Sequence, residues 1–266
     1  MRRGVLFFLI LIVLQGAVEL FALNQELPFS VGEKLEYSIH AIGLTVGRQI
    51  IELEDVVKHR GKAVYRLTGR SRSSPFLSIF YRLDDRWLVL IEEETILPLR
   101  VEKEMVEGKN EGYFVYDIDN DSGTVNIYNM ESGTVKTVQS NNTVFDLFTL
   151  IYYYRSNPAN FTNTFTFDFL EHKRVSTVQF RNDGEVMLDM PGISRRSPVS
   201  ALKLSQIGGA GIEIYVGADE LRLPLKLIVP SKLPRNRRVI IEFYLEHFSP
   251  GKLQKNVPEQ YKKLRF

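Results

Sequence analysis

The feature that most constrains the fold is an alternation of apolar and polar residues with a period of two. In residues 99–107, Leu99, Val101 and Met105 occupy alternate positions, with Arg100, Glu102 and Glu104 between them. In residues 161–169 every phenylalanine falls at an odd position, and residues 239–245 repeat the pattern. Side chains that alternate in this way point to opposite faces of a β-strand. The pattern therefore predicts half-buried antiparallel strands.

Turn signals separate the predicted strands at short intervals. They lie at Gly43 and in residues 60–61, 108–112, 119–123, 131–133, 182–184 and 208–211. Such short intervals fit hairpins better than strand–helix–strand crossovers. A sheet of about a dozen strands generally curls or closes, because a long open sheet leaves edges that must be covered. The sequence therefore predicts a mainly β protein, with a strongly curved antiparallel sheet or an incomplete β-barrel.

One segment, residues 143–156, departs from the period of two. Its apolar residues fall at helical spacing at Leu147, Leu150, Ile151 and Tyr154. Thr143 or Asp146 can cap the start, and Asn157-Pro158 supplies the stop. The other faces are also apolar, and a helix that is apolar nearly all round belongs inside a protein. We expect one buried helix across the concave face or one mouth of the sheet; a buried strand over residues 146–154 is the alternative.

Composition is that of one globular domain with no strong electrostatic partner. The chain has 266 residues, of which 44% are hydrophobic and 25% are charged. Its 34 Lys and Arg residues nearly balance 32 Asp and Glu residues, so the net charge is only +2. A nucleic-acid-binding protein concentrates more positive charge. The balance excludes nucleic acid as an expected partner.

The N-terminus has the three-part order of a secretory signal. Two arginines precede an apolar run from Val5 to Leu14, and small residues follow. This run is shorter than the roughly 20 residues that a membrane span needs. We expect residues 1–22 to direct export to the periplasm or cell envelope, with cleavage after Ala22. Leu20 fits the cleavage rule poorly, so an uncleaved anchor is the alternative. The chain has no cysteine, which excludes disulfides and thiolate sites.

The C-terminal residues 249–266 carry a basic tail. Its positive charges are Lys252, Lys255, Lys262, Lys263 and Arg265. The simplest interpretation is a frayed, solvated terminus. The functional alternative is contact with anionic lipid or another envelope component, because clustered basic residues attract such surfaces.

Four blocks of the sequence resemble, in order, the exported bacterial proteins known as DUF3108. They are PFSVGEKLEYSIHAIGLTVGRQIIELEDV (28–56), FYRLDDRWLVLIEEETILPLRVEKEMVEG (80–108), DLFTLIYYYRSNP (146–158) and GADELRLPLKLIVP (217–230). The resemblance covers residues 28–248, the expected single domain. It implies a signal-bearing, β-rich periplasmic or envelope protein whose activity is not established. The Gly-rich stretch GGAGIEIYVG departs from the family pattern, so we infer no ligand contact there.

Carboxylate groups give weak indications of chemistry. Glu92 and Glu94 would share a strand face at a separation of about 6.6 Å, which overlaps what glycoside hydrolysis requires. Asp84 and Asp85 are strand neighbours and would point to opposite faces. The spacing of Asp117, Asp119 and Asp121 resembles that of the first carboxylates of a calcium-binding loop, but a hairpin turn explains these residues equally well. We therefore predict no catalytic residue, no metal site and no cofactor, with a polysaccharide hydrolase as a minor alternative.

Tyr152, Tyr153 and Arg155 form the candidate binding group. On a helix they would present an aromatic wall with one cation at its end. Core packing is the simpler interpretation. The functional one is a cavity for a lipid or other amphiphile, with Arg155 meeting an anionic head group. The leading hypothesis is thus a non-enzymatic envelope protein that holds an apolar or amphiphilic ligand; a cavity-free scaffold that meets envelope partners through a strand edge or the basic tail is the alternative.

Overall fold

A computed structural model describes residues 27–171, 174–191, 198–233, 237–254, 257–262 and 264. The predicted signal, residues 1–22, lies outside the described residues. The strands are β1 (Lys34–Ala41), β2 (Leu44–His59), β3 (Lys62–Ser73), β4 (Asp84–Glu92), β5 (Pro98–Glu107), β6 (Asn110–Asp119), β7 (Thr124–Asn129), β8 (Thr134–Gln139), β9 (Val144–Phe145), β10 (Thr164–Glu171), β11 (Arg174–Leu188), β12 (Val199–Ile207), β13 (Glu213–Gly217), β14 (Pro224–Leu233) and β15 (Arg237–Ser249). The helices are α2 (Pro75–Ser78), α3 (Leu147–Ser156), the 3-10 helix η1 (Pro158–Phe161) and α4 (Glu259–Lys262).

All the described strands form one sheet in the order β8-β7-β6-β5-β4-β3-β2-β1-β15-β14-β13-β12-β11-β10-β9. Neighbours are antiparallel, except that the two residues of β9 pair with β10 in parallel. β1 joins the two halves, because it pairs with β2 on one side and β15 on the other. Within the described residues β8 and β9 end this order, so the sheet does not close. The predicted curved, mainly antiparallel β fold is confirmed, and its form is an incomplete barrel.

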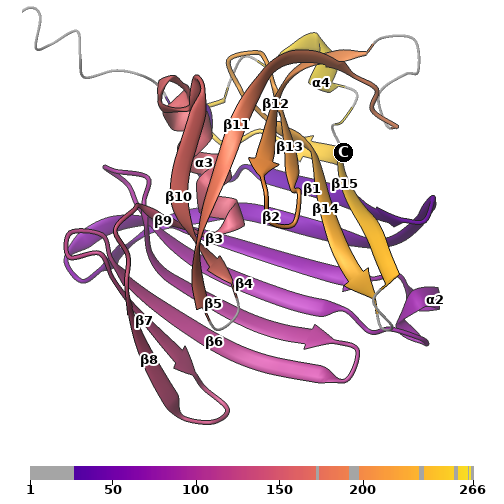
Figure 1. Cartoon of the computed structure of the whole chain (residues 1–266). Coiled ribbons are helices and arrows are strands. Elements are labelled where there is room, and N and C mark those ends of the chain that lie inside the picture. Colours follow the sequence, from indigo (N-terminus) through magenta and orange to yellow (C-terminus); the bar gives the residue numbers. More distant parts are fainter. Residues whose placement is uncertain are drawn as a thin grey trace, which may run out of the picture.

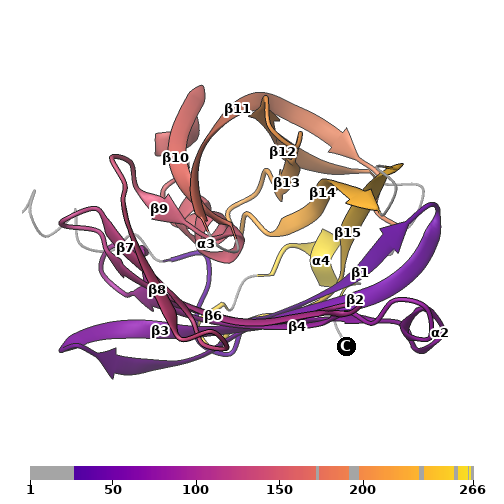
Figure 2. The ribbon, with the colours of Figure 1, turned by 60° about the horizontal axis from the view of Figure 1, so that its bottom comes forward.

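The sheet folds over on itself around α3 (Figures 1 and 2). Figure 2 shows β1 to β8 as a broad layer and β10 to β14 arching above it, with α3 between them. None of the described helices is long and apolar enough to span a bilayer.

Most of the predicted turns join neighbouring strands. At the β1–β2 turn, Ile42 and Gly43 have φ of 52° and 73°, and glycine adopts this left-handed region without steric cost. Residues 182–184 are an exception, because they lie inside β11. There the register shifts between Asn182 and Gly184, and Asn182 Oδ1 accepts the Gly184 N–H at 2.9 Å. The predicted turn is a β-bulge.

The buried helix is confirmed, with a later start than residue 143. Val144 and Phe145 form β9 instead, because they complete the sheet beside β10. Asp146 is the N-cap: its Oδ1 accepts the Phe148 N–H at 2.8 Å, and Thr149 Oγ1 accepts the Asp146 N–H at 3.1 Å. At the other end the Asn157 N–H donates to Tyr153 O, and Pro158 opens η1.

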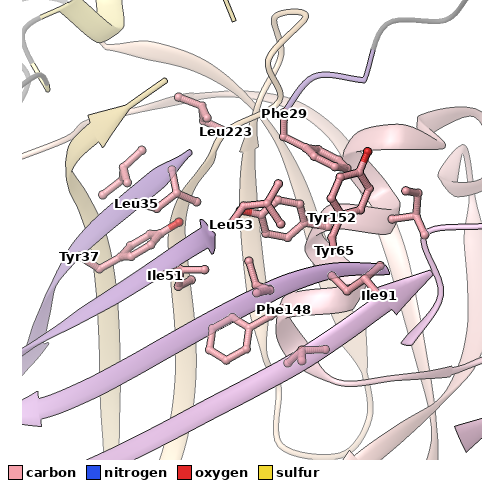
Figure 3. Close-up of a cluster of buried hydrophobic side chains, with 14 of the residues drawn as sticks. Phe29, Leu35, Tyr37, Ile51, Leu53, Tyr65, Ile91, Phe148, Tyr152 and Leu223 are labelled. Carbon is pink, nitrogen blue, oxygen red and sulfur yellow. The ribbon is translucent and has the colours of Figure 1, made fainter. Parts of the chain in front are cut away.

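The helix packs against both halves of the sheet. Phe148 and Tyr152 enter the core over β1 to β7, whereas Leu150 and Tyr154 join a second cluster with phenylalanines of β9 to β11. Figure 3 shows Phe148 and Tyr152 facing the apolar side chains of the broad layer. Gly69 on β3 permits this approach, since a Cβ there would lie 3.3 Å from the Phe148 ring. The helix is therefore the inner layer of the core.

The C-terminal tail is not a solvated terminus in its described part. Val257, Tyr261 and Leu264 are buried in the main core. The Phe248 N–H donates to Leu264 O at 2.8 Å, and the Tyr261 hydroxyl bonds to the Asp219 carboxylate. The prediction from charge was wrong because these three apolar residues anchor the segment.

Candidate functional site

A cavity of about 840 Å³ lies between the concave face of the broad layer and the strands that arch over it. β1 to β6 supply one wall, β14 and β15 contribute to the other, and the first residues of α3 close the inner end. Most lining side chains are apolar, for example Ile39, Val101, Leu147, Leu227 and Phe243. Pockets of roughly 300–1,000 Å³ with such walls are typical of small-molecule sites.

A stripe of buried polar side chains crosses the cavity wall. Gln49, Ser71 and Asp85 lie side by side on β2, β3 and β4, because Ser71 is in register with both of the others. All three are buried, and Ser71 Oγ donates to Gln49 Oε1 at 2.7 Å. A polar group in an apolar wall is costly unless it is hydrogen-bonded. The stripe is therefore the place where a bound molecule's polar end could be recognised.

Lys103 on β5 adds a cation to this stripe. Its Nζ lies 5.5 Å from the centre of the Trp87 ring, another lining residue. Three carboxyl groups interact with it electrostatically, those of Asp85, Glu107 and Asp146. Burial lowers the pKa of Lys103, and these carboxyl groups partly offset the effect.

Asp85 is a buried carboxyl group of the cavity wall. Burial raises its pKa to about 6, Lys103 opposes this rise, and Glu107 adds to it. Its Oδ1 accepts the Val106 N–H at 3.0 Å, which fixes the side chain toward the cavity. Asp146 lines the same end while it caps α3, and burial raises its pKa against the hydrogen bonds of the cap. The polar end thus holds more carboxyl groups than ammonium groups.

The residues predicted from the sequence to bind a ligand lie elsewhere. Tyr152, Tyr153 and Arg155 do not line the cavity. Tyr153 packs between Phe145 and Phe161, with ring centres at 5.0 and 5.9 Å. Arg155 is fully buried and forms a two-point ion pair with Glu33, at 2.6 and 2.8 Å. Its predicted position at a cavity rim is therefore wrong.

Glu33 and Arg155 are the centre of a buried polar cluster at the C-terminal end of α3. Arg155 Nε donates to Leu221 O at 3.1 Å, and the Tyr152 hydroxyl donates to Glu33 at 2.9 Å. Gln254 Nε2 reaches the same carboxylate at 2.8 Å. Burial alone would lower the pKa of Arg155, but the Glu33 charge outweighs it and raises the pKa. The guanidinium therefore stays charged. Through Glu33 it connects α3 to the N-terminal segment before β1 and to Gln254 in the C-terminal segment.

The carboxylate candidates do not form a catalytic pair. Glu92 ends β4 and pairs with Lys62 at 2.7 Å, whereas Glu94 lies in the following turn. They share no strand face, so the predicted hydrolase geometry is absent. Asp84 and Asp85 point apart as expected, since Asp84 accepts two hydrogen bonds from Arg70.

The aspartates of residues 117–121 serve a turn and ion pairs. Asp117 pairs with Arg60 and Arg100, and Asp119 Oδ1 accepts the N–H groups of Asp121 and Ser122. Across the part of the chain that the structure describes, no group of three or more His, Asp or Glu residues is arranged to hold a metal.

Sequence reasoning missed the polar stripe, although one signal was present. Lys103 has the same parity as Val101 and Met105, so it is a charged residue on an apolar strand face. Gln49 and Ser71 gave no comparable signal, because they become neighbours only through the pairing register of β2 and β3.

Comparisons with known proteins support the fold. The model of a family described as "Protein of unknown function (DUF3108)" matches residues 36–234. The chain belongs to this family. No curated protein matches it. A solved "Beta-barrel-like Protein of Domain of Unknown Function DUF1849 from Brucella abortus" is similar in fold, with a TM-score of 0.54 and 8% identity over 84% of this chain and 98% of that one.

Proposed function

We propose that this DUF3108 protein is a non-enzymatic, exported cell-envelope protein that holds an amphiphile in the cavity of its curved sheet. The observation that carries the proposal is the cavity of about 840 Å³ with its apolar wall and single polar stripe. Such a site binds a molecule by burying apolar surface and orients it through a few polar contacts. The signal-like N-terminus supports the envelope as the compartment.

The charges of the cavity disfavour an anionic head group. Arg155, the cation first considered for an anionic head, is neutralised by Glu33 away from the cavity. Lys103 faces the carboxyl groups of Asp85 and Glu107. An anionic head group there would be repelled by these carboxylates, and repulsion is strong in a site of low dielectric constant. The amphiphile is therefore one with a neutral, hydrogen-bonding or cationic polar group.

Displacement of an apolar fluorescent dye tests this function. A fatty alcohol and an alkylammonium of the same chain length should displace the dye at concentrations about tenfold or more below that of the matching carboxylate. Ala41→Phe, which places a large ring on the cavity wall, should weaken dye binding about tenfold, and Ala63→Phe on the exposed start of β3 should not. Equal binding by both variants, or no saturable dye binding, would refute the proposal.

A second candidate function rests on the sheet edge. β8 ends the strand order, and five of its six residues are exposed. An exposed edge strand is a template for pairing with a partner strand. If the protein is a scaffold, crosslinks from β8 to an envelope partner should survive in Ala41→Phe. Their loss on blocking the cavity would assign the contact to the bound ligand.

A further inference from the structure

The mouth of the cavity is surrounded by exposed apolar side chains. Ile42 and Leu44 form the tip of the β1–β2 hairpin, and Phe76, Ile79 and Phe80 belong to α2 and the residues after it. Each of these five side chains is between 68% and 80% exposed. We call this set the apolar rim. Single exposed apolar residues are common on proteins, whereas a cluster of large ones marks an interaction site.

The two parts of the apolar rim lie at the same end of the sheet. The Ser74 N–H, just before α2, donates to Val46 O on β2 at 2.8 Å. The Phe76 and Phe80 rings are in edge contact, with centres 5.8 Å apart. Figures 1 and 2 show α2 projecting beyond the ends of the strands of the broad layer. The rim is thus a protrusion and not a flat face.

The apolar rim continues the wall of the cavity onto the surface. Ile42 and Leu44 are exposed and also line the cavity. Leu77 of α2 and Tyr81 after it line the cavity as well. An apolar molecule could therefore move between the cavity and the rim without crossing water.

Basic side chains flank the apolar rim. Arg82 follows Tyr81 directly, and the Gly108 N–H donates to Arg82 O at 2.7 Å, which brings the β5–β6 turn with Lys109 beside it. The side chains of Arg82 and Lys109 are both exposed. The nearby carboxylate of Asp84 is held by Arg70. Glu104 and Glu111 are exposed acidic residues of this hairpin, and Glu104 pairs with Arg86 at 3.4 Å. Cations next to exposed aromatic and aliphatic residues match the interface of an anionic lipid membrane.

We propose that the apolar rim inserts into the surface of an anionic lipid bilayer, so that the cavity mouth opens onto the acyl chains. The five side chains of the apolar rim enter the membrane interface, while Arg82 and Lys109 contact the phosphate groups of the lipids. This docking goes beyond the proposed ligand binding, because it requires the rim and not an occupied cavity. It would also let a lipid-soluble ligand pass between the bilayer and the cavity without entering water.

Vesicle flotation of the protein without residues 1–22 tests the docking. The protein should float with vesicles of phosphatidylcholine and phosphatidylglycerol, and weakly with phosphatidylcholine alone. Phe76→Ser with Phe80→Ser, and separately Ile42→Ser with Leu44→Ser, should reduce binding about tenfold or more. The control, Val135→Ser with Met187→Ser, alters apolar residues on β8 and β11 that are 59% and 64% exposed, and it should bind normally. Arg82→Glu with Lys109→Glu should lose only the preference for the anionic vesicles.

A site-specific label shows which part of the surface contacts the bilayer. The chain has no cysteine, so Ile79→Cys and Val135→Cys each offer one thiol for an environment-sensitive dye. Vesicles should shift the emission of the dye at residue 79 to the blue and leave that at residue 135 unchanged. Equal flotation of rim and control variants, or equal emission at both positions, would overturn the proposal. Concentration-dependent dimers that the rim variants abolish, without vesicle binding, would assign the rim to a second copy instead. Unchanged dye binding in the cavity of the Phe76→Ser, Phe80→Ser variant, whose changed residues do not line the cavity, would separate this result from the proposed function.

Discussion

At the scale of single residues, two pairs of charged side chains have different roles. Glu33 and Arg155 satisfy each other and fix the end of α3. Asp85 and Lys103 face the cavity, where a bound molecule can reach them. The sequence drew attention to Arg155 because of its aromatic neighbours. It could not show Glu33 as the partner, since 122 positions separate the two residues.

The Glu33–Arg155 pair predicts a large cost for removing one partner. Arg155→Met should lower the free energy of unfolding by about 3–5 kcal/mol, because Glu33 is left charged and buried. Adding Glu33→Gln should recover part of this loss. Arg86→Met breaks the exposed pair with Glu104 and should cost less than about 1 kcal/mol. Urea denaturation of the parent protein and the three variants measures these differences. A cost of Arg155→Met no larger than that of Arg86→Met would contradict the structural role of the buried pair.

Asp85 predicts a specific pH dependence of stability. Its pKa of about 6 in the folded state exceeds the ordinary value of 3.8, so the folded protein binds this proton more tightly than the unfolded chain. The contribution of Asp85 to stability is therefore present at low pH and is lost as the pH rises through 6. Asp85→Asn should gain stability relative to the parent protein by up to about 3 kcal/mol between pH about 4 and about 8. Urea midpoints across this range check the sign, and a pH-independent difference would contradict it.

At the scale of elements, local patterns predicted the segments better than their boundaries. Residues 143–156 gave the helix, its Asp146 cap and its stop at Asn157-Pro158. The strand β9 was missed, because a two-residue strand has no period. Leu99 was assigned to the face of Val101 but packs with Val64 and Leu90, since the register shifts between Leu90 and Ile91. Bulges reverse the alternation on which such assignments depend.

The cap of α3 gives a prediction at this scale. Asp146→Ala removes the acceptor for the first helical N–H groups and should cost about 1–2 kcal/mol of stability. Asp146→Asn retains an acceptor at the same position and should cost clearly less. Thermal and urea unfolding distinguish the two variants. Equal losses would mean that the carboxylate matters for its charge and not for the cap.

At the scale of the whole molecule, the curved sheet and the buried helix together create the cavity. Strand alternation and the number of strands were sufficient to predict a curved, incomplete barrel around a helix. They could not predict the space that the helix leaves empty, because its walls come from β1 to β6 and from β14 and β15, which are far apart in the sequence. The tail was likewise misassigned, since Tyr261 and Leu264 find their burial only in the assembled core.

The tryptophan of the chain provides the most direct test of the cavity as a ligand site. The sequence contains a single tryptophan, Trp87, and it lines the cavity beside Lys103. Titration with a fatty alcohol that carries bromine on its chain should quench Trp87 fluorescence saturably, and Ala41→Phe should weaken this quenching about tenfold. Quenching that is linear and unsaturated, or the same in Ala41→Phe as in the parent protein, would contradict ligand binding in the cavity.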